Sequence, residues 1–340
     1  MQFVSRLLLL ALFVGGNIMA AEPAEIKYET SPAVNLGPEK GVMRRDPSDI
    51  IKVGDLFYVW YTKGAMNSGY DATVWHATSK DGKTWSEKGE ALARGPAGSW
   101  DEQSVFTPNI LVTANEYWLF YTAVPKPFIN SGPEITKTAI GLAVSDSPDG
   151  PWKKLDSNPV LKTSDNHKEF DSLRVDDACL VVRDGKYWLY YKGRQWGNTP
   201  GNTKMGVAIA DKPEGPYVKS KHNPVVGGGH EVMVWPYGKG VVALIGHVGP
   251  KGTAKTLRYA GDGVTFTKMA DLRSVPHAPG AYRPEAFSDS GKGTMTGWGL
   301  HIGTTKGFFP FLERFEYEWK KEGTAEQSPP GDSPKAAPEE

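Results

Sequence analysis

Hydrophobic and polar positions alternate along most of the chain, and four short runs repeat the same pattern. Residues 55–61 read DLFYVWY, 116–121 read EYWLFY and 185–191 read GKYWLYY, while 240–245 (GVVALI) are a plainer version. Alternation with period two, together with aromatic and β-branched side chains, predicts β-strands. Beyond the apolar N-terminal stretch, we find no long amphipathic pattern with helical period. An all-β fold is therefore expected.

Each of these runs is followed by a second strand-like run and then by a glycine-containing turn that ends in an aromatic residue. The second runs lie at 74–79, 140–145, 205–210 and 256–260. The turns lie at 81–85, 148–152, 213–217 and 261–266. Sequences such as Asp-Gly tolerate the positive φ that tight hairpin turns need. The repeating unit is thus a small antiparallel sheet.

A short polar segment opens each unit. The five openings lie at 45–50, 107–111, 176–180, 230–233 and 283–287. Counted from positions 46, 107, 177, 230 and 283, the steps are 61, 70, 53 and 53 residues. Four-stranded repeats at this spacing are typical of propeller blades. The sequence therefore predicts a five-bladed β-propeller with four antiparallel strands per blade.

Acidic residues recur at the openings. They are Asp46 with Asp49, Asp176 with Asp177, Glu231 and Glu285. The first strand of a blade is innermost, so these side chains should gather around the central axis. Carboxylates brought together away from water are costly, and their pKa values are pushed apart. Such a cluster favours an acid–base active site over a purely structural role.

Composition narrows the setting of this site. Lys+Arg and Asp+Glu are 39 each, so no net charge attracts nucleic acid or an anionic membrane. With 11 Trp, 14 Tyr and 13 Phe, the chain has many rings on which a sugar could stack. The only cysteine, Cys179, allows no internal disulfide and lies far from the N-terminus, so it cannot be a lipoprotein's lipid-modified cysteine.

The chain ends predict export and one folded domain. Residues 1–21 combine Arg6, a short apolar run and small residues at the end, which is typical of a signal peptide and too short for a membrane span. We expect an N-terminal extension at 22–40, the propeller at 41–320 and a disordered polar tail at 321–340. The mature protein should be periplasmic or extracellular and free of the membrane.

The openings also carry a family resemblance. The Arg-Asp-Pro motif at 45–47, Val-Asp-Asp-Ala at 175–178 and Gly-His-Glu at 229–231 resemble the five-bladed glycosidases of families 43 and 117, as does the segment Trp-Asp…Thr-Pro-Asn at 100–109. The resemblance covers roughly residues 41–319. In family 43 this pattern implies a base on the first blade, a residue that tunes a pKa on the third and an acid on the fourth.

Carried onto this chain, the resemblance makes Asp46 the base, Asp177 the pKa-tuning residue and Glu231 a member of the acid machinery. The histidine before the glutamate is closer to family 117, the 3,6-anhydro-L-galactosidases, and implies that His230 donates the proton. Two roles stay open: Glu231 donates while His230 contacts the sugar, or His230 donates while Glu231 orients it. Histidine can act near neutral pH with little tuning. If the third-blade strand is regular, Asp176 should face away from Asp177.

Further residues are candidates for substrate contact. They are Arg45, Trp75, His76, Glu102, Gln103, Thr107, Lys192, Arg194, Gln195, Arg283 and Glu285. The polar cluster at 192–195 could hold a hydroxyl, a carboxylate or a sulfate. Arg283 and Glu285 could instead form an ion pair that closes the propeller, and Asp49 is expected to be structural or to support Arg44 or Arg45.

The expected function is that of a secreted, exo-acting and inverting glycoside hydrolase. By resemblance to family 117, its substrate is an agar-derived oligosaccharide, from whose non-reducing end it releases 3,6-anhydro-L-galactose. A family 43-like arabinosidase or xylosidase is the alternative, and a carbohydrate-binding propeller without catalysis is a third. No cofactor is required and no metal ligand set is predicted, although the sequence leaves room for a divalent ion near His230. The sequence does not fix the oligomeric state.

Overall fold

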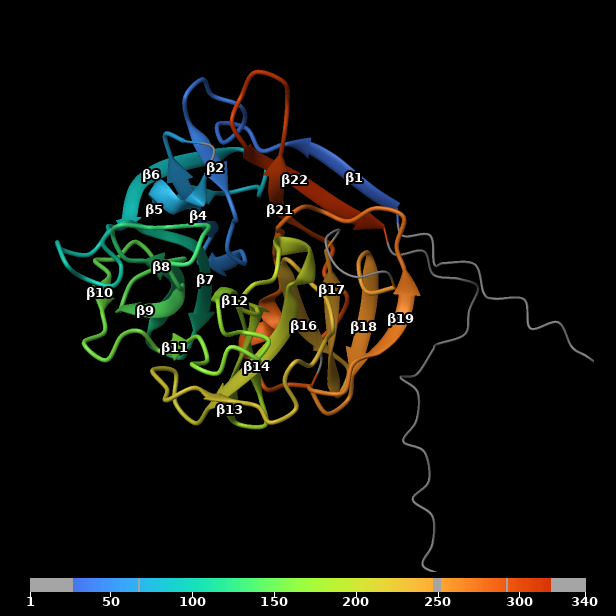
Figure 1. The fold of residues 1–340 in the computed structure, drawn as a ribbon. Coiled ribbons are helices and arrows are strands. Elements are labelled where there is room, and N and C mark those ends of the chain that lie inside the picture. Colours follow the sequence, from blue (N-terminus) through green and yellow to red (C-terminus); the bar gives the residue numbers. More distant parts are fainter. Residues whose placement is uncertain (1–26, 67, 247–251, 292, 319–340) are drawn as a thin grey trace, which may run out of the picture.

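The computed structural model describes residues 27–66, 68–246, 252–291 and 293–318. The predicted signal peptide and the predicted tail lie outside these residues. Five antiparallel sheets form a ring in chain order, which confirms the five-bladed propeller (Figure 1). In the described part of the chain, the helical elements are three short 3-10 helices. They are η1 (Gly69–Asp71), η2 (Pro200–Asn202) and η3 (Pro284–Phe287).

Strand order follows the chain within the first four blades. Blade one contains β2 (Met43–Arg45), β3 (Ile51–Val53), β4 (Leu56–Gly64), β5 (Ala72–Ser79) and β6 (Trp85–Leu92). Blade two contains β7 (Ser104–Val112), β8 (Tyr117–Val124), β9 (Ala139–Ser145), β10 (Lys153–Lys154) and β11 (Leu161–Lys162). Blade three contains β12 (Arg174–Arg183), β13 (Lys186–Arg194), β14 (Lys204–Ala210) and β15 (Val218–Lys219). Blade four contains β16 (Val232–Tyr237), β17 (Gly240–Ile245), β18 (Thr256–Ala260) and β19 (Thr267–Asp271).

The fifth blade is completed by the other end of the chain. Its strands are β20 (Gly280–Ala281), β21 (Trp298–Gly303), β22 (Phe311–Glu318) and β1 (Lys27–Pro32). Strand β1 pairs antiparallel with β22 as the outermost strand (Figure 1). It lies in the segment predicted as an N-terminal extension, so the propeller begins well before residue 41. Just after it, Ala33 and Leu36 are fully buried.

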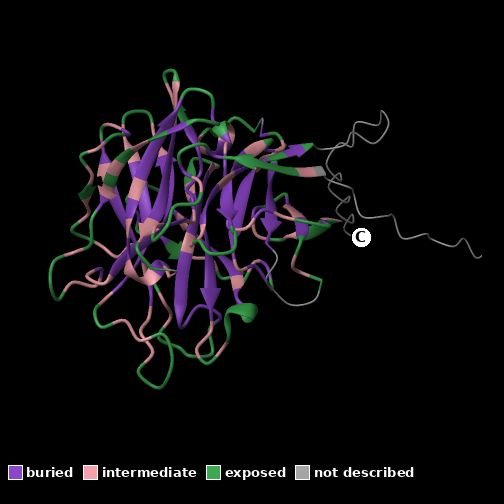
Figure 2. Ribbon diagram, turned by 90° about the horizontal axis from the view of Figure 1, so that it is seen from above, coloured by how far each residue is buried: buried purple, intermediate pink, exposed green. Residues whose placement is uncertain are grey.

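The hydrophobic core is divided among the interfaces between blades. Five buried clusters each combine residues of two neighbouring blades, and the fifth joins blade five to blade one. The aromatic strands recognised in the sequence supply the largest members, such as Trp60, Tyr121 and Tyr191. Each fully buried large side chain contributes about 1.5–3 kcal/mol through apolar burial. Figure 2 shows this layer as buried strands surrounded by exposed loops.

The innermost strands share an unusual backbone conformation at the point where they reach the axis. Asp46, Thr107 and Asp177 have φ of 49°, 42° and 54°, in the left-handed region that residues other than glycine rarely adopt. In β7 and β12 the pairing register shifts at these positions, as in a β-bulge. Such bulges re-aim side chains and are frequent beside active sites.

The bulge changes one prediction. A regular strand would turn Asp176 and Asp177 to opposite sides, yet both side chains lie in the same cavity. The register of β12 shifts between Asp176 and Cys179, so strict alternation fails there. Both carboxylates therefore face the axis.

Candidate active site

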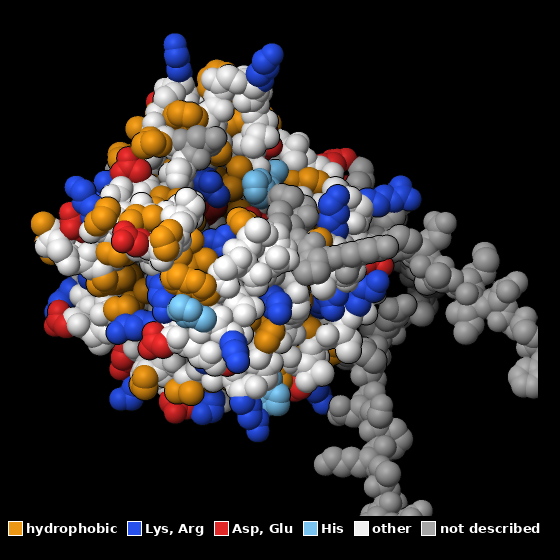
Figure 3. Space-filling view, viewed as in Figure 1, with side chains coloured by type: hydrophobic (Ala, Val, Ile, Leu, Met, Phe, Trp, Pro, Cys, Tyr) orange, Lys and Arg blue, Asp and Glu red, His pale blue; other side chains and the backbone are white. Residues whose placement is uncertain are grey.

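A cavity of about 330 Å³ lies where the openings of the inner strands converge. Figure 3 shows this face of the ring hollowed near its centre, with basic side chains and a histidine around the hollow. The lining residues are Arg45, Asp46, Ser68, Gly69, Tyr70, Phe106, Thr107, Asn130, Arg174, Asp176, Asp177, Lys192, Arg194, Pro200, Thr203, His230 and Glu231. A smaller cavity of about 40 Å³ shares Asp46, Thr107, Asp177 and Glu231 with it. On the side of the fifth blade this smaller cavity is lined by Ala278 and Pro279, just before β20, and not by the predicted opening at 283–287.

Three of the acidic side chains are held by basic neighbours. Arg45 Nε lies 2.8 Å from Asp46 Oδ2, and Lys192 Nζ lies 2.6 Å from Asp177 Oδ2 and 3.6 Å from Asp176 Oδ1. The charge of Asp46 raises the pKa of Arg45, although burial opposes it. Lys192 is buried, which by itself disfavours its charge, but the two aspartates raise its pKa well above the usual range. Lys192 is thus positively charged at every relevant pH.

Asp177 is held less firmly in its charged form. Burial raises its pKa to about 7; Lys192 opposes the shift, while the neighbouring Asp176 and Asp46 add to it. A carboxyl group with such a pKa changes charge in the range where enzymes commonly work. It can therefore alter the field of the cavity without leaving its place.

Glu231 has the opposite character. His230 Nδ1 lies 2.7 Å from Glu231 Oε1, and His277 Nε2 lies 3.8 Å from the same oxygen. Burial would raise the pKa of Glu231, but the hydrogen bond and charge of His230, with Lys192 and His277, outweigh it and lower the pKa to about 2. Glu231 is therefore a carboxylate near neutral pH. Its second oxygen is buried and makes no hydrogen bond to a described residue.

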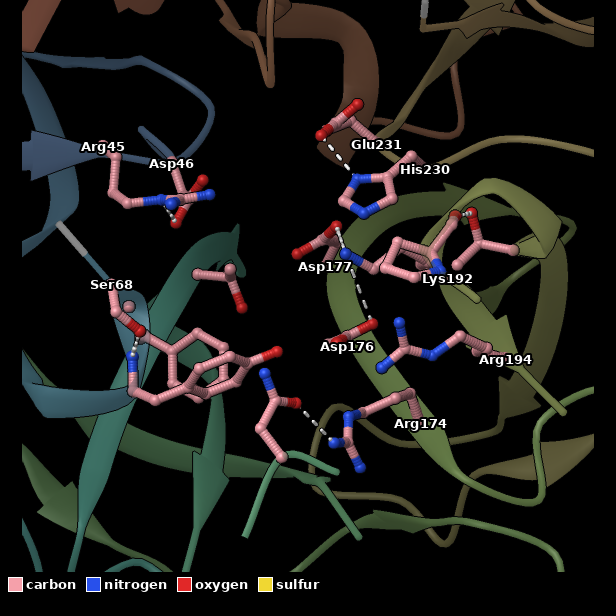
Figure 4. A pocket seen from close by; sticks show the side chains of 17 residues that line it. Arg45, Asp46, Ser68, Arg174, Asp176, Asp177, Lys192, Arg194, His230 and Glu231 are labelled. Atoms are coloured by element: carbon pink, nitrogen blue, oxygen red, sulfur yellow. Dashed lines mark hydrogen bonds and ion pairs between the residues drawn. The ribbon is translucent and has the colours of Figure 1, made fainter. Parts of the chain in front are cut away.

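Figure 4 shows how these groups are arranged. Arg45 and Asp46 lie on one side of the cavity, and His230 and Glu231 lie on the other, with Asp177 beside them. The two sides come from the first blade and from the third and fourth blades. A sugar bound between them would have a carboxylate on one face and an imidazole on the other.

Of the other predicted contacts, Thr107 and Arg194 also line this cavity. Thr107 is fixed by its backbone, which donates to Thr62 Oγ1 at 2.8 Å, and its hydroxyl lies 2.5 Å from that of Thr122. Arg45, Asp46, Asp177, Lys192, His230 and Glu231 complete the set of predicted residues that the fold brings together.

Arg283 and Glu285 lie elsewhere, so their predicted substrate contact is wrong for this cavity. Arg283 is buried and forms an ion pair with Asp49, and it donates to the carbonyls of Leu180 (2.7 Å) and Val234 (2.6 Å). This one side chain therefore ties blade five to blades one, three and four. Glu285 lies on η3, where Ser288 and Ser290 donate to its carboxylate. Asp49 is structural, as expected, but supports Arg283 rather than a residue of its own blade.

Trp75 and His76 also lie outside the cavity, within the sheet of the first blade. Lys63 lies over the Trp75 ring at 3.7 Å, while His76 is buried, stacks on Trp60 and approaches Asp149 at 3.6 Å. Burial lowers the pKa of His76, which favours its neutral form. Both rings pack against neighbouring side chains instead of facing a ligand.

Glu102, Gln103 and Gln195 do not line the cavity, so their predicted substrate contact is wrong for this cavity. Glu102 accepts a hydrogen bond from the backbone of Gly98 at 2.7 Å, and Gln103 donates to the carbonyl of Tyr70 at 3.3 Å. Gln195 donates to the carbonyl of His167 at 3.2 Å. These side chains position loops, and Gln103 supports the loop that brings Tyr70 into the cavity.

Sequence reasoning missed several lining residues. They are Ser68, Gly69, Tyr70, Phe106, Asn130, Arg174, Pro200 and Thr203, with Asp176. Most come from loops between strands, where no periodic signal exists. Arg174 shares the face of Asp176 by period-two alternation, and the sequence predicted that face to point away from Asp177, so the bulge that brings Asp176 into the cavity also reveals Arg174.

Among the described residues, no group of three His, Cys, Asp or Glu side chains is placed to hold a metal ion. The divalent ion that the sequence leaves room for near His230 thus gains no ligand set there. None of the described helices has the length and apolar character needed to cross a membrane.

Known proteins match this chain in sequence and in fold. The sequence model of "Glycosyl hydrolases family 43" matches residues 40–178. A xylosidase/arabinosidase 43A of Humicola insolens is 40% identical over 72 residues, which are 21% of this chain and 20% of that protein. The match thus spans about a fifth of the length of that curated relative.

Solved structures extend the likeness to the whole propeller. A family 43 enzyme of Xanthomonas citri, solved with xylose, has a TM-score of 0.57 at 13% identity over 84% of this chain and 89% of its own, which shows the fold alone. Zg3597, a family 117 glycoside hydrolase of the marine bacterium Zobellia galactanivorans, has a TM-score of 0.76 at 30% identity, over 86% of this chain and 91% of that one. The predicted resemblance is confirmed, and the protein is a member of glycoside hydrolase family 117.

Proposed function

We propose that this glycoside hydrolase inverts the anomeric centre, with His230 as the proton donor and Asp46 as the base. The observation that carries the proposal is the pair of His230 and Glu231, in which Glu231 has a pKa of about 2 and so has no proton to give. The carboxylate at 2.7 Å orients the imidazole, which is the remaining member of the pair that can carry the donated proton. Of the two roles that the sequence left open, this geometry supports donation by histidine.

Asp46 acts from the opposite side of the cavity (Figure 4). Its carboxylate is held by Arg45, and its left-handed backbone aims the side chain at the axis. There it removes a proton from the water that attacks the anomeric carbon, while His230 protonates the leaving oxygen. Inversion requires room for that water, so the donor and Asp46 should stand roughly 6.5–9.5 Å apart across the bound sugar.

Asp177 tunes the donor side. It lies in the same cavity as His230 and shares Lys192 with Asp176. Because its pKa is about 7, its charge rises as the pH passes neutrality, and the negative form stabilises a positively charged imidazole nearby. This is the role that the resemblance to family 43 assigns to it.

For the substrate, we propose an agar-derived oligosaccharide that loses 3,6-anhydro-L-galactose from its non-reducing end. Membership of family 117 and the His-Glu pair at 230–231 support this choice. The cavity volume is near the lower end of the ~300–1,000 Å³ typical of small-molecule pockets, which suits a short end of a chain and hence exo action. Residues 1–21 support secretion, to the periplasm or beyond.

The test is to incubate the mature protein with neoagarobiose, an aryl arabinofuranoside and an aryl xyloside while following anomeric protons by NMR. Release of anhydrogalactose with inverted configuration is expected. Cleavage of the pentosides alone would transfer the assignment to a family 43-type activity, which the match of residues 40–178 favours as second candidate. Retention of configuration would refute the proposed roles of Asp46 and His230.

A further inference from the structure

Two arginines lie side by side on the wall of the cavity away from Asp46. Arg174 on β12 and Arg194 on β13 are direct partners in the antiparallel register, so both side chains leave the sheet on the same face. Figure 4 shows both guanidinium groups directed into the cavity. Like charges directly opposite each other destabilise a sheet. A site that keeps such a pair needs something negative between them.

The residues that the structure describes supply no such partner to Arg194. Its side chain is only 8% exposed, its Nε atom makes no hydrogen bond, and no described residue forms an ion pair with it. A buried and unpaired charge is among the most costly features of a folded protein. Arg194 is thus a nearly buried cation that lines an open cavity without a partner.

The guanidinium group of Arg174 has only some of its hydrogen-bond donors paired. It is 1% exposed and donates to the Asn130 side chain at 3.1 Å and to the carbonyls of Thr136 and Leu173. These acceptors are neutral, and the Nε atom has no partner. Burial lowers the pKa of Arg174; Tyr70 and Asp176 oppose this shift, and the charge of Arg194 adds to it.

The acidic side chains of the cavity are engaged elsewhere. Arg45 holds Asp46, Lys192 holds Asp177, and His230 holds Glu231. Asp176 lies 3.6 Å from Lys192 and forms no ion pair with either arginine. Because the pKa of Asp177 is about 7, this group carries only part of its charge at neutral pH. The net charge on the wall that carries Arg174 and Arg194 is therefore positive.

We infer that the cavity binds a sugar carrying an anionic substituent, a sulfate ester or a carboxylate, seated between Arg174 and Arg194. The planar guanidinium fork matches both oxyanions and can bind them with two parallel hydrogen bonds. Tyr70 and Phe106 also line the cavity and pack edge to face at 5.4 Å, offering aromatic surface to the sugar ring. The inference rests on the proposed glycosidase function for what the anion is attached to.

Hydrolysis is tested with three substrates that differ only in charge: neoagarobiose, monosulfated neoagarobiose and its uronate analogue. We expect kcat/KM to be higher for a charged substrate than for the neutral one by about 10-fold to 100-fold, the value of hydrogen bonds to a charged group. The sulfated and uronate arms identify which anion fits. In Arg194→Gln the ratio of kcat/KM for the charged substrate to kcat/KM for the neutral one should fall toward one. In Arg194→Lys this ratio should be intermediate, because the charge remains but the guanidinium fork is lost.

Arg183→Gln is the matched control, since Arg183 ends the same strand β12 but does not line the cavity. It should leave the ratio as in the wild type. Circular dichroism of each variant establishes that the fold is retained. A ratio near one in the wild-type protein, or a ratio in Arg194→Gln equal to that of the wild type, would overturn the inference.

Binding measured without turnover separates this inference from the proposed function. Calorimetry with inorganic sulfate and with acetate reports the site even if no sugar is cleaved, and Arg194→Gln should weaken the better ligand about 10-fold or more. Anion binding that depends on Arg194, with no hydrolysis of any substrate, would support the site while refuting the function. Hydrolysis without any preference for anions would do the reverse.

Discussion

Replacing His230 by glutamine tests the proposed donor directly. Glutamine keeps a polar side chain of similar reach beside Glu231 but cannot carry an acidic proton. At pH 7, a carboxyl group with a pKa of about 2 is protonated in only about one molecule in 10⁵, equivalent to ~7 kcal/mol at 1.36 kcal/mol per pH unit. In the wild-type protein Glu231 is therefore not the donor. In His230→Gln its pKa rises, because the hydrogen bond and charge of His230 are lost, but Lys192 and His277 still favour its charged form. General acid catalysis contributes about 10²–10⁴-fold to rate, and we expect His230→Gln to lose that factor on an oligosaccharide.

The assay compares two leaving groups. The leaving oxygen of a sugar needs a proton to depart, whereas a dinitrophenolate does not. Hydrolysis of dinitrophenyl 3,6-anhydro-L-galactoside should therefore fall by less than about 10-fold in the same variant. His222→Gln is the matched control, because His222 is exposed and does not line the cavity. If His230→Gln keeps its activity on the oligosaccharide within about 10-fold of the wild type, the assignment of the donor is refuted.

Three further predictions follow from the same geometry. Asp46→Asn should lower turnover by at least about 10²-fold, because the base is lost. The melting temperature should stay nearly unchanged, because the fold is kept. Turnover near the wild-type rate would exclude Asp46 as the base. The folded-state pKa of Asp177, about 7, lies above the ordinary value of 3.8, so the folded protein binds more protons than the unfolded chain between these limits. The free energy of unfolding in urea should therefore decrease as the pH rises from 4 to 7, by at most about 1.4 kcal/mol per pH unit from this group. Asp177→Asn should flatten that slope. An equal slope in both proteins would contradict the raised pKa of Asp177. Asp49→Asn breaks the buried ion pair with Arg283 and should lower the free energy of unfolding by about 3–5 kcal/mol, as measured by denaturant titration. A loss below about 1 kcal/mol would show that the pair does not hold the blades together.

The fold was largely predictable because each blade repeats one local pattern. The aromatic second strands and the glycine-containing turns recur often enough to count the blades from sequence. Strand β1 was not found, since its six residues carry no repeat signal and its partner β22 is almost 300 positions away in the chain. Only the closed ring identifies it as a strand of the last blade.

The site was predictable at the blade openings and not beyond them. Asp46, Asp177 and Glu231 converge because the first strand of each blade runs along the axis. The bulge at Asp177 was hidden, because a left-handed residue inside a strand leaves no trace in an alternating pattern. The predictions for Trp75 and His76 failed for another reason. Aromatic residues occur in sugar sites and in blade packing alike, and only the structure shows that Lys63 covers the Trp75 ring and that His76 is buried.

The closure of the fifth blade by β1 has a consequence for how this protein is made. Strand β22 has no outer neighbour until the beginning of the chain pairs with it, and an unpaired strand edge invites association with other chains. The last blade therefore cannot be completed while the C-terminal strands are still being synthesised. Contacts between such distant segments also form slowly, because the intervening chain must first be ordered. Once formed, the pairing fastens the first described strand to the last, and neither end of the ring can fray without breaking the hydrogen bonds of the other.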